Sequence, residues 1–190
     1  DAASLGRDLG HTPFGHSGER VLDMLSTNGF AHYKHSIRVV DKLENGGKGL
    51  NLTYEVKDAI LNHTGEGKAE TLEGGLIKLA DRIAYINHDI DDAVRAGVLS
   101  EEELPREVVE VLGNTKSARI DSLVRSIIKN SDTDIKMDPD TEKCYDTLHN
   151  FLFSAVYSNP KAKSEESKVA DIVEGLFTYI VKNPDKLSPE

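Results

Sequence analysis

Apolar residues recur at three- and four-residue spacing along most of the chain, which is the pattern of amphipathic helices. Strand-like alternation is scarce, and polar glycine-bearing segments at 45–49 and 64–68 favour loops. The pattern therefore predicts an all-α protein. We expect helices over 17–27, 33–45, 53–63, 71–96, 105–112, 117–130, 141–157 and 165–182.

The longest predicted helix, 71–96, has a marked start and end. Thr71 fits an N-cap, and Gly97 follows the last periodic residue. Gly74 and Gly75 would each weaken the start of the helix by about 1 kcal/mol relative to alanine. We expect a close helix crossing to explain them, in preference to a ligand approaching the backbone. The apolar stripe of this helix is predicted to face the core, through Leu72, Leu76, Leu79, Ile83, Ile86, Ile90 and Val94.

The chain changes character after residue 134, where aromatic residues gather in two predicted helices split by 160–164. Aromatic residues at such spacings are usual in a core. We expect two domains, 1–134 and an appended helical module over 135–190. The aromatic residues predicted to be buried in this module are Tyr145, Phe151, Phe153, Tyr157, Phe177 and Tyr179.

The composition limits the classes of partner. A formal net charge of −10 argues against an extended nucleic-acid surface, although a small anionic ligand can still be held by a few cations or a bridging metal ion. The single cysteine, Cys144, excludes an internal disulfide and fits a reducing compartment. Neither a membrane-spanning apolar run nor a signal-peptide layout is evident, so we expect a soluble, cytoplasmic protein.

A dense group of chemically active residues lies near the N-terminus. Asp8, His11, His16 and Glu19 fall within twelve residues. Each alone has an ordinary explanation, such as a surface histidine or a solvated first-turn acid. Together they place His16 beside a helix N-terminus, which favours anions, with Glu19 about one turn further on. A carboxylate near an imidazole can fix its tautomer, so His16 and Glu19 are a candidate acid–base pair.

A second group lies on the long predicted helix. Asp81, Tyr85 and Asp89 recur at four-residue spacing. Four residues displace a side chain by only about 40° around a helix, so the three share one face. The alternative to a functional face is an ordinary solvated one.

These segments together resemble the HD-domain deoxynucleoside triphosphate triphosphohydrolases. The resemblance implies an HD-domain helical bundle, lacking its first helices, with the C-terminal helical associated module over 135–190. It covers nearly the whole chain, with the HD-motif segment at Leu5 to Arg20, helices at Phe30 to Glu44 and Leu52 to Thr64, the aspartate-bearing helix at Thr71 to Ala93, and the module at Met137 to Pro184.

The resemblance implies an enzyme in which water attacks the α-phosphorus of a deoxynucleoside triphosphate and releases tripolyphosphate. Asp8 and Asp81 match aspartates that bind a divalent metal, Mg²⁺ or Mn²⁺. His16 matches the catalytic histidine and Glu19 its acidic partner.

The remaining implied roles concern substrate and assembly. Tyr85 and Asp89 match residues that hold the deoxyribose, and Arg38 matches an arginine to which we assign a phosphate-binding or structural role. The resemblance also implies a homo-oligomer. Base preference is not implied.

Two departures from the family pattern affect the metal site. Arg7 stands where the His of the His-Asp pair belongs, and a guanidinium has no lone pair to give to a metal. Only seven residues precede Asp8, so we expect the early helix with another histidine ligand to be missing. We expect metal binding to be weak or absent, and Arg7 to pair with Asp8 in preference to replacing the metal beside the triphosphate.

Three functional hypotheses follow. The first is a metal-dependent triphosphohydrolase impaired by Arg7. The second is an inactive nucleotide-binding or regulatory subunit of the same family. The third, an HD phosphohydrolase acting on monophosphates or cyclic nucleotides, fits the residue pattern less well.

Overall fold

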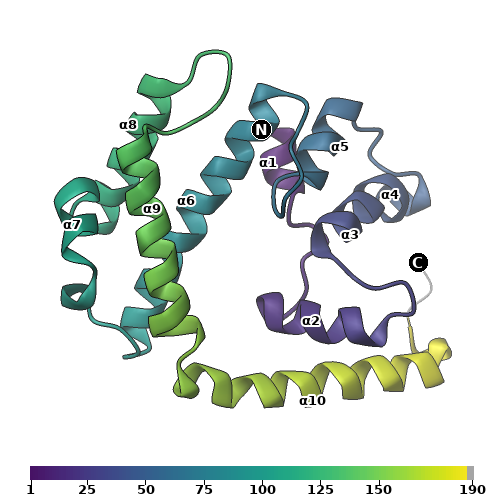
Figure 1. Cartoon of the computed structure of the whole chain (residues 1–190). Coiled ribbons are helices and arrows are strands. Elements are labelled where there is room, and N and C mark those ends of the chain that lie inside the picture. The colour runs from purple at the N-terminus through teal and green to yellow at the C-terminus, as the bar shows by residue number, and fades with distance from the viewer. Residues whose placement is uncertain (188–190) are drawn as a thin grey trace. The chain divides into compact units, whose positions relative to one another are not determined.

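The structure, a computed structural model, describes residues 1–187, except for the side chains of residues 160–167. Every regular element in this range is helical, which confirms the predicted all-α class (Figure 1). No described helix is both long and apolar enough to cross a membrane. The helices are α1 (Ala2–Gly6), α2 (Gly15–Leu25), α3 (His32–Arg38), α4 (Glu44–Gly47), α5 (Tyr54–Leu61), α6 (Leu72–Arg95), α7 (Arg106–Leu112), α8 (Lys116–Asn130), α9 (Pro139–Leu152) and α10 (Pro160–Lys182).

Two of the predicted helix boundaries that are wrong have local explanations. The helix expected over 33–45 is α3 followed by a wide π-type turn at Val39–Leu43, and the chain then reverses because Asn45 takes a left-handed φ of 56°. The break expected at 160–164 falls instead at Ser158 and Asn159. Proline suits the first position of a helix, where no backbone N–H is needed, and α10 begins at such a residue.

The described chain forms two compact units, which are described separately. One unit comprises Asp1–Ile77 and Ser164–Glu190. Its apolar core joins α1 to α5, and a Cβ at Gly6 would stand 2.8 Å from the side chain of Ile60. The core residues of this unit are Ala3, Ala59 and Ile60, with Ile37, Leu52, Val56 and Ile77 packed against them.

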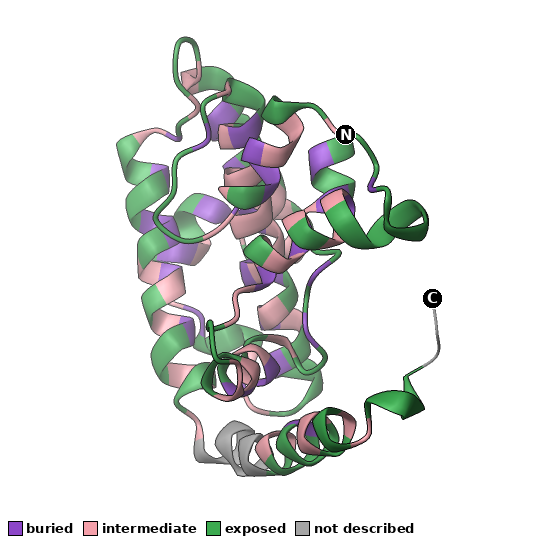
Figure 2. Ribbon diagram, turned by 90° about the vertical axis from the view of Figure 1, so that its right-hand side faces the viewer, coloured by how far each residue is buried: buried purple, intermediate pink, exposed green. Residues whose placement is uncertain are grey.

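The other unit comprises Lys78–Lys163. Its core is larger and takes one face from each of α6, α7, α8 and α9. Figure 2 shows the buried residues of the chain in purple. The fully buried residues at its centre include Ile86, Ile90, Val108, Leu112, Leu123, Leu148 and Leu152.

The stripe predicted on α6 is right in its middle and wrong at its ends. Ile83, Ile86 and Ile90 are buried, whereas the members of the stripe that are exposed are Leu72, Leu76 and Val94. At the start of α6 the buried residue is Gly74, and residues two positions away on a helix point to nearly the opposite side. The glycine, not the leucines, therefore makes the contact with the core.

Close packing explains Gly74, as expected. A Cβ there would overlap the side chain of Ala69 and stand 3.3 Å from that of Ala59. The predicted N-cap is also confirmed, because the Thr71 hydroxyl accepts the N–H of Gly74 at 3.1 Å. The start of α6 is therefore fixed by one cap and one close contact.

The predicted burial of aromatic residues holds for only part of the set. Tyr145 is 1 % exposed, but Phe153 is 60 % and Tyr179 is 53 % exposed. Phe153 lies eight residues beyond Tyr145, which is about 80° around an α-helix, so its side chain leaves the face that Tyr145 occupies. On α10, Val173 is the buried hydrophobic residue among those whose side chains are described, so most of that helix faces outward.

The start of α9 is fixed by a polar cap. One carboxylate oxygen of Asp138 accepts the backbone N–H of Thr141 at 3.0 Å, and the other accepts the hydroxyls of Ser126 at 2.6 Å and Thr141 at 2.7 Å. The Ser126 hydroxyl, followed by the two groups of Thr141, lowers the pKa of Asp138 to about 2. The ionised carboxylate therefore stabilises the fold, because the cap favours the charged form.

We expect Asp138→Ala to lower the free energy of unfolding at pH 7 by about 1 kcal/mol, the usual cost of losing an N-cap. The deficit should be constant above the ordinary carboxyl pKa of 3.8 and should narrow as the pH falls from there towards 2, where the native carboxyl is protonated. Urea unfolding across this pH range measures the deficit in the free energy of unfolding. Asp132→Ala is the control, and an Asp138→Ala deficit independent of pH would contradict the prediction.

Candidate functional site

The loop that carries Asp8 is tied to α3 through a buried serine. The Ser36 hydroxyl donates to the carbonyl of Arg7 at 2.7 Å and accepts the N–H of Gly10 at 2.9 Å. A Cβ at Gly10 would overlap backbone atoms of α3, so the loop can come this close only with glycine at that position. The tie places Asp8 beside the first turn of α3.

The turn after this loop sets the start of α2. Phe14 and Gly15 both take left-handed φ values, of 64° and 58°, and the Thr12 hydroxyl donates to the carbonyl of Gly15 at 2.9 Å. The helix consequently begins two residues before the predicted position. His16 lies in its first turn, and Glu19 lies one turn later.

Glu19 holds the first residue of α3. Its Oε1 accepts the backbone N–H of His32 at 2.7 Å, and its two carboxylate oxygens lie 3.0 and 3.1 Å from Nδ1 of that imidazole. An ionised carboxylate only accepts hydrogen bonds, so Nδ1 carries the proton. The lone pair of the buried His32 ring is therefore on Nε2.

His63 is fixed in the same tautomer by a different partner. It follows α5, is 2 % exposed, and its Nδ1 lies 2.7 Å from the carbonyl oxygen of Ile60. A carbonyl only accepts, so the lone pair is again on Nε2. Asp58 stabilises the adjoining loop, because its carboxylate accepts the Asn62 amide and the backbone N–H of Glu70, both at 2.7 Å.

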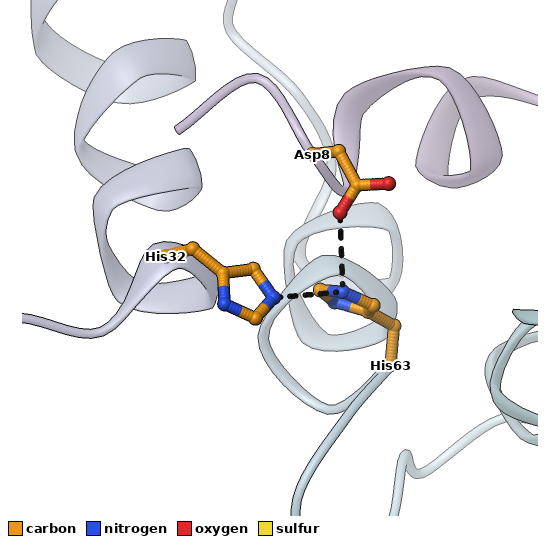
Figure 3. A group of neighbouring side chains, drawn as sticks. All are labelled: Asp8, His32 and His63. Carbon is orange, nitrogen blue, oxygen red and sulfur yellow. Dashed lines mark hydrogen bonds and ion pairs between the residues drawn. The ribbon is translucent and has the colours of Figure 1, made fainter. Parts of the chain in front are cut away.

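The two histidines and Asp8 meet at one point (Figure 3). Nε2 of His32 lies 3.4 Å from Nε2 of His63, which lies 3.6 Å from Oδ1 of Asp8. All three ligand atoms fall within 4.8 Å of one another. Two lone pairs and a carboxylate repel one another unless a proton or cation lies among them. Histidine rings whose Nδ1–H is held by a carboxylate or carbonyl are typical metal ligands, so the group fits a divalent metal.

The charges of the group suit this role. The neighbouring His63 lowers the pKa of Asp8, burial opposes the shift, and the Arg7 guanidinium supports it. Burial would raise the pKa of Glu19, but the backbone N–H and imidazole of His32 hold it below its usual value. Burial also lowers the pKa of His32. Anionic carboxylates and a neutral imidazole are the forms that ligate or support a metal.

Arg7 pairs with Asp8, as expected from the sequence. Its Nη2 lies 3.3 Å from Oδ2 of Asp8, and its Nη1 donates to the carbonyl of Ser4 at 2.8 Å. The guanidinium thus occupies one carboxylate oxygen while the other faces His63. Its positive charge opposes a cation at the same carboxylate.

The predicted pair of His16 and Glu19 includes a further residue, His32. The hydrogen bonds of Glu19 go to His32, a residue that the sequence analysis did not single out. His16 is exposed and lies close by, with its ring centroid 6.1 Å from that of His32 and 5.9 Å from that of His11. His11, His16, Glu19 and His32 therefore form one cluster of side chains.

The predicted face of α6 lies in the other unit and is hydrogen-bonded within it. Tyr145 donates its hydroxyl to the hydroxyl of Tyr85 at 3.1 Å, and Tyr157 donates to the carboxylate of Asp89. Burial, followed by these neighbours, raises the pKa of both Tyr145 and Tyr157. Tyr85 and Asp89 therefore do not form an ordinary solvated face. Asp81 is half-buried on the same helix, and its predicted metal ligation stays a prediction.

Sequence reasoning missed His32 and His63 as metal-ligand candidates. Each stands at the edge of a predicted helix, and each falls within a segment that carried the family resemblance. In the sequence, the signal that could have identified each residue was a histidine at the boundary of a predicted helix. The two are 31 positions apart, so only the packing of α3 beside α5 brings them together.

We expect the chain to bind Mn²⁺, as measured by titration calorimetry, because imidazole nitrogen and carboxylate oxygen are ligands of that ion. His63→Ala and Glu19→Gln should each weaken binding by about tenfold or more. The first removes a candidate ligand, and the second removes the charge that orients His32.

His88→Ala, which removes an exposed histidine of the other unit, should leave the Mn²⁺ affinity unchanged. Circular dichroism should show that all three variants remain helical. Equal Mn²⁺ affinity in wild type and His63→Ala would show that the cluster is not a metal site.

Comparison with known proteins agrees with this geometry. The chain matches the HD domain over residues 8–86 and the phosphohydrolase-associated domain over residues 135–190. It is 52% identical over 192 residues to a deoxyguanosinetriphosphate triphosphohydrolase-like protein of Caldanaerobacter subterraneus, covering 100% of this chain and 57% of that protein. Proteins of the same name are 44% identical in Clostridium tetani over 98% of this chain and 57% of that protein, and 32% identical in Ralstonia nicotianae over 100% and 64%.

The chain thus spans little more than half the length of the first two of these relatives. The two matched domains occur in the order that the sequence predicted, and the residues of the Asp8 cluster all fall within the first of them. The chain therefore belongs to the HD-domain phosphohydrolase family, with an HD domain followed by a phosphohydrolase-associated domain.

Proposed function

We propose that this chain hydrolyses a deoxynucleoside triphosphate to a deoxynucleoside and tripolyphosphate, using a divalent metal at Asp8, His32 and His63. The observation that carries the proposal is the convergence of two fixed Nε2 lone pairs on one carboxylate. The names of the relatives support the substrate class, because they are called deoxyguanosinetriphosphate triphosphohydrolase-like proteins.

The donor set favours Mn²⁺ over Mg²⁺. Mg²⁺ prefers an octahedron of oxygen ligands and keeps several waters, whereas two of the three donors here are imidazole nitrogens. A bound divalent ion supplies Lewis-acid polarisation of a phosphoryl oxygen and a lowered pKa for a water. Asp81, which the resemblance assigns as a further ligand, remains part of the proposal on sequence grounds.

The residues around the cluster have separable tasks. Water adds to the α-phosphorus, the bond from phosphorus to the 5′-oxygen breaks, and that oxygen must gain a proton to leave as the deoxynucleoside. His16 is exposed at the first turn of α2 and is our candidate to give this proton. Glu19 holds His32 in the tautomer that directs Nε2 at Asp8 and His63, so Glu19 is a positioning residue.

The backbone supports an anionic substrate. The N-terminus of α2 carries the positive end of the helix dipole, which favours phosphate oxygens. Tyr85 and Asp89 are proposed to hold the deoxyribose, as the resemblance implies, because a phenol and a carboxylate can bond its 3′-hydroxyl. In the structure both are already positioned by the hydroxyls of Tyr145 and Tyr157.

A second candidate function is nucleotide binding without turnover. The pairing of Arg7 with Asp8 favours it, because the guanidinium competes with a metal for that carboxylate. In that case the site would retain its affinity for the triphosphate but lack the cation that the chemistry needs. The two candidates differ in whether tripolyphosphate is formed.

We expect Arg7→His to release tripolyphosphate from dGTP, in the presence of Mn²⁺, at least about tenfold faster than the wild-type chain. The substitution removes a cation that repels the metal and adds an imidazole with a lone pair. Phosphorus NMR of the products measures the rate and shows which bond is cleaved. His16→Ala in the Arg7→His background should lower the rate by about 100-fold, a usual effect of losing an acid–base group.

Arg7→Gln is the control, because it removes the charge without supplying a ligand. If neither the wild type nor Arg7→His forms tripolyphosphate from any of the four common deoxynucleoside triphosphates, release of tripolyphosphate is excluded as the function of this chain. A rise in melting temperature with dGTP but no product would then identify the nucleotide-binding alternative.

A further inference from the structure

A cavity of about 600 Å³ lies in the same unit as the Asp8 cluster, between the loop after α2, the helix α3 and the helix α10. The residues that define its chemistry are Thr27, Asn28, Phe30, Lys34, Arg38 and Phe177. None of them belongs to the group formed by Asp8, His32 and His63.

The cavity carries two cations that lack carboxylate partners. Within the part of the chain that the structure describes, Lys34 and Arg38 form no ion pair, whereas Arg7, Lys57 and Lys116 each pair with an aspartate. The Lys34 ammonium lies 5.8 Å from the centroid of the Tyr33 ring. Both cations therefore remain able to bind an anion, although the formal net charge of the chain is −10.

The acidic residue on the wall of the cavity does not neutralise them by direct contact. Asp23 uses Oδ1 to accept the backbone N–H of Phe30 at 2.7 Å, which caps the loop. His35 lies between the cations in sequence, and burial together with the charge of Arg38 lowers its pKa. Lys34 and Arg38 therefore place two positive charges on the wall of the cavity.

The cavity and the metal-ligand cluster lie on different faces of one helix. Each residue advances about 100° around a helix, so Lys34 and Arg38 stand about 200° and 240° from His32. Ser36, at about 40° from His32, faces the Asp8 loop. A ligand held by Lys34 and Arg38 would therefore be separated from the metal cluster by the body of α3.

We propose that this cavity is a second binding site, for a small phosphate-bearing anion held by Lys34 and Arg38. The two side chains are one turn apart and can bind neighbouring phosphate oxygens with charge-assisted hydrogen bonds. The Thr27 hydroxyl and the Asn28 amide add neutral donors on the same wall. Phe30 and Phe177 provide apolar surface, so both inorganic polyphosphate and organic phosphates share the required chemistry. On this proposal, the phosphate-binding role expected for Arg38 belongs to this cavity and not to the metal centre.

Calorimetric titration with inorganic tripolyphosphate and with dGTP, in EDTA to remove metal, tests the proposal. The double variant Lys34→Gln with Arg38→Gln should bind tripolyphosphate at least about tenfold more weakly than wild type, because two charge-assisted contacts are lost. Arg125→Gln with Lys129→Gln is the matched control. It removes the same two charges, also four residues apart and exposed, from α8 of the other unit.

The comparison of probes identifies the source of the phosphate. Tighter binding of dGTP than of tripolyphosphate, lost in Phe177→Ala, supports the site with an organic phosphate as ligand. Equal affinities for dGTP and tripolyphosphate, both unchanged in Phe177→Ala, support the site with an inorganic phosphate as ligand.

Three results would overturn the proposal: no binding of either probe, equal weakening by the control pair, or loss of binding in His63→Ala. The last would place the phosphate at the metal cluster. The proposal does not depend on hydrolysis, since binding is measured without metal, and a chain that forms no tripolyphosphate could still hold phosphate here.

Discussion

The hydrogen bonds of Ser36 are the constraint on which the candidate site depends. One hydroxyl joins the Asp8 loop to α3 by donating to Arg7 and accepting from Gly10. Without this tie, a glycine-containing loop would have many alternative conformations, and ordering it would cost about 1–2 kcal/mol per residue. Because the tie is buried and leaves no room for a side chain at Gly10, Asp8 is held beside His32 before any metal or substrate arrives.

The second requirement is a fixed direction for two imidazole rings. Glu19 and the carbonyl of Ile60 each take an Nδ1–H, which leaves both Nε2 lone pairs facing Asp8. A cation bound among these groups would be attracted by both lone pairs and by the carboxylate, and preorganised ligands of this kind are typical of metal centres. Arg7 acts against that attraction by placing a fixed positive charge at the same carboxylate.

The short helix α3 connects the features that we assign to function. Its first residue contributes to the candidate metal site, Ser36 anchors the Asp8 loop, and Lys34 with Arg38 forms the positive wall of the separate cavity. A helix presents different faces to different neighbours, so seven residues suffice for three contacts. The cavity and the metal-ligand cluster therefore share the helix α3, but each would bind its own ligand.

The helical class, the N-cap of α6 at Thr71, the family and the pairing of Arg7 with Asp8 could all be predicted from the amino-acid sequence. These depend on local periodicity, capping and adjacency, which are properties of neighbouring residues. Only the tertiary structure decided that Glu19 serves His32 and that His63 joins Asp8, because these partners are 13 and 55 positions apart in sequence and meet through helix packing. Burial was decided in the same way: Leu72 and Leu76 fit the apolar pattern, but the close contact of Gly74 with Ala69 and Ala59 turns them towards the surface.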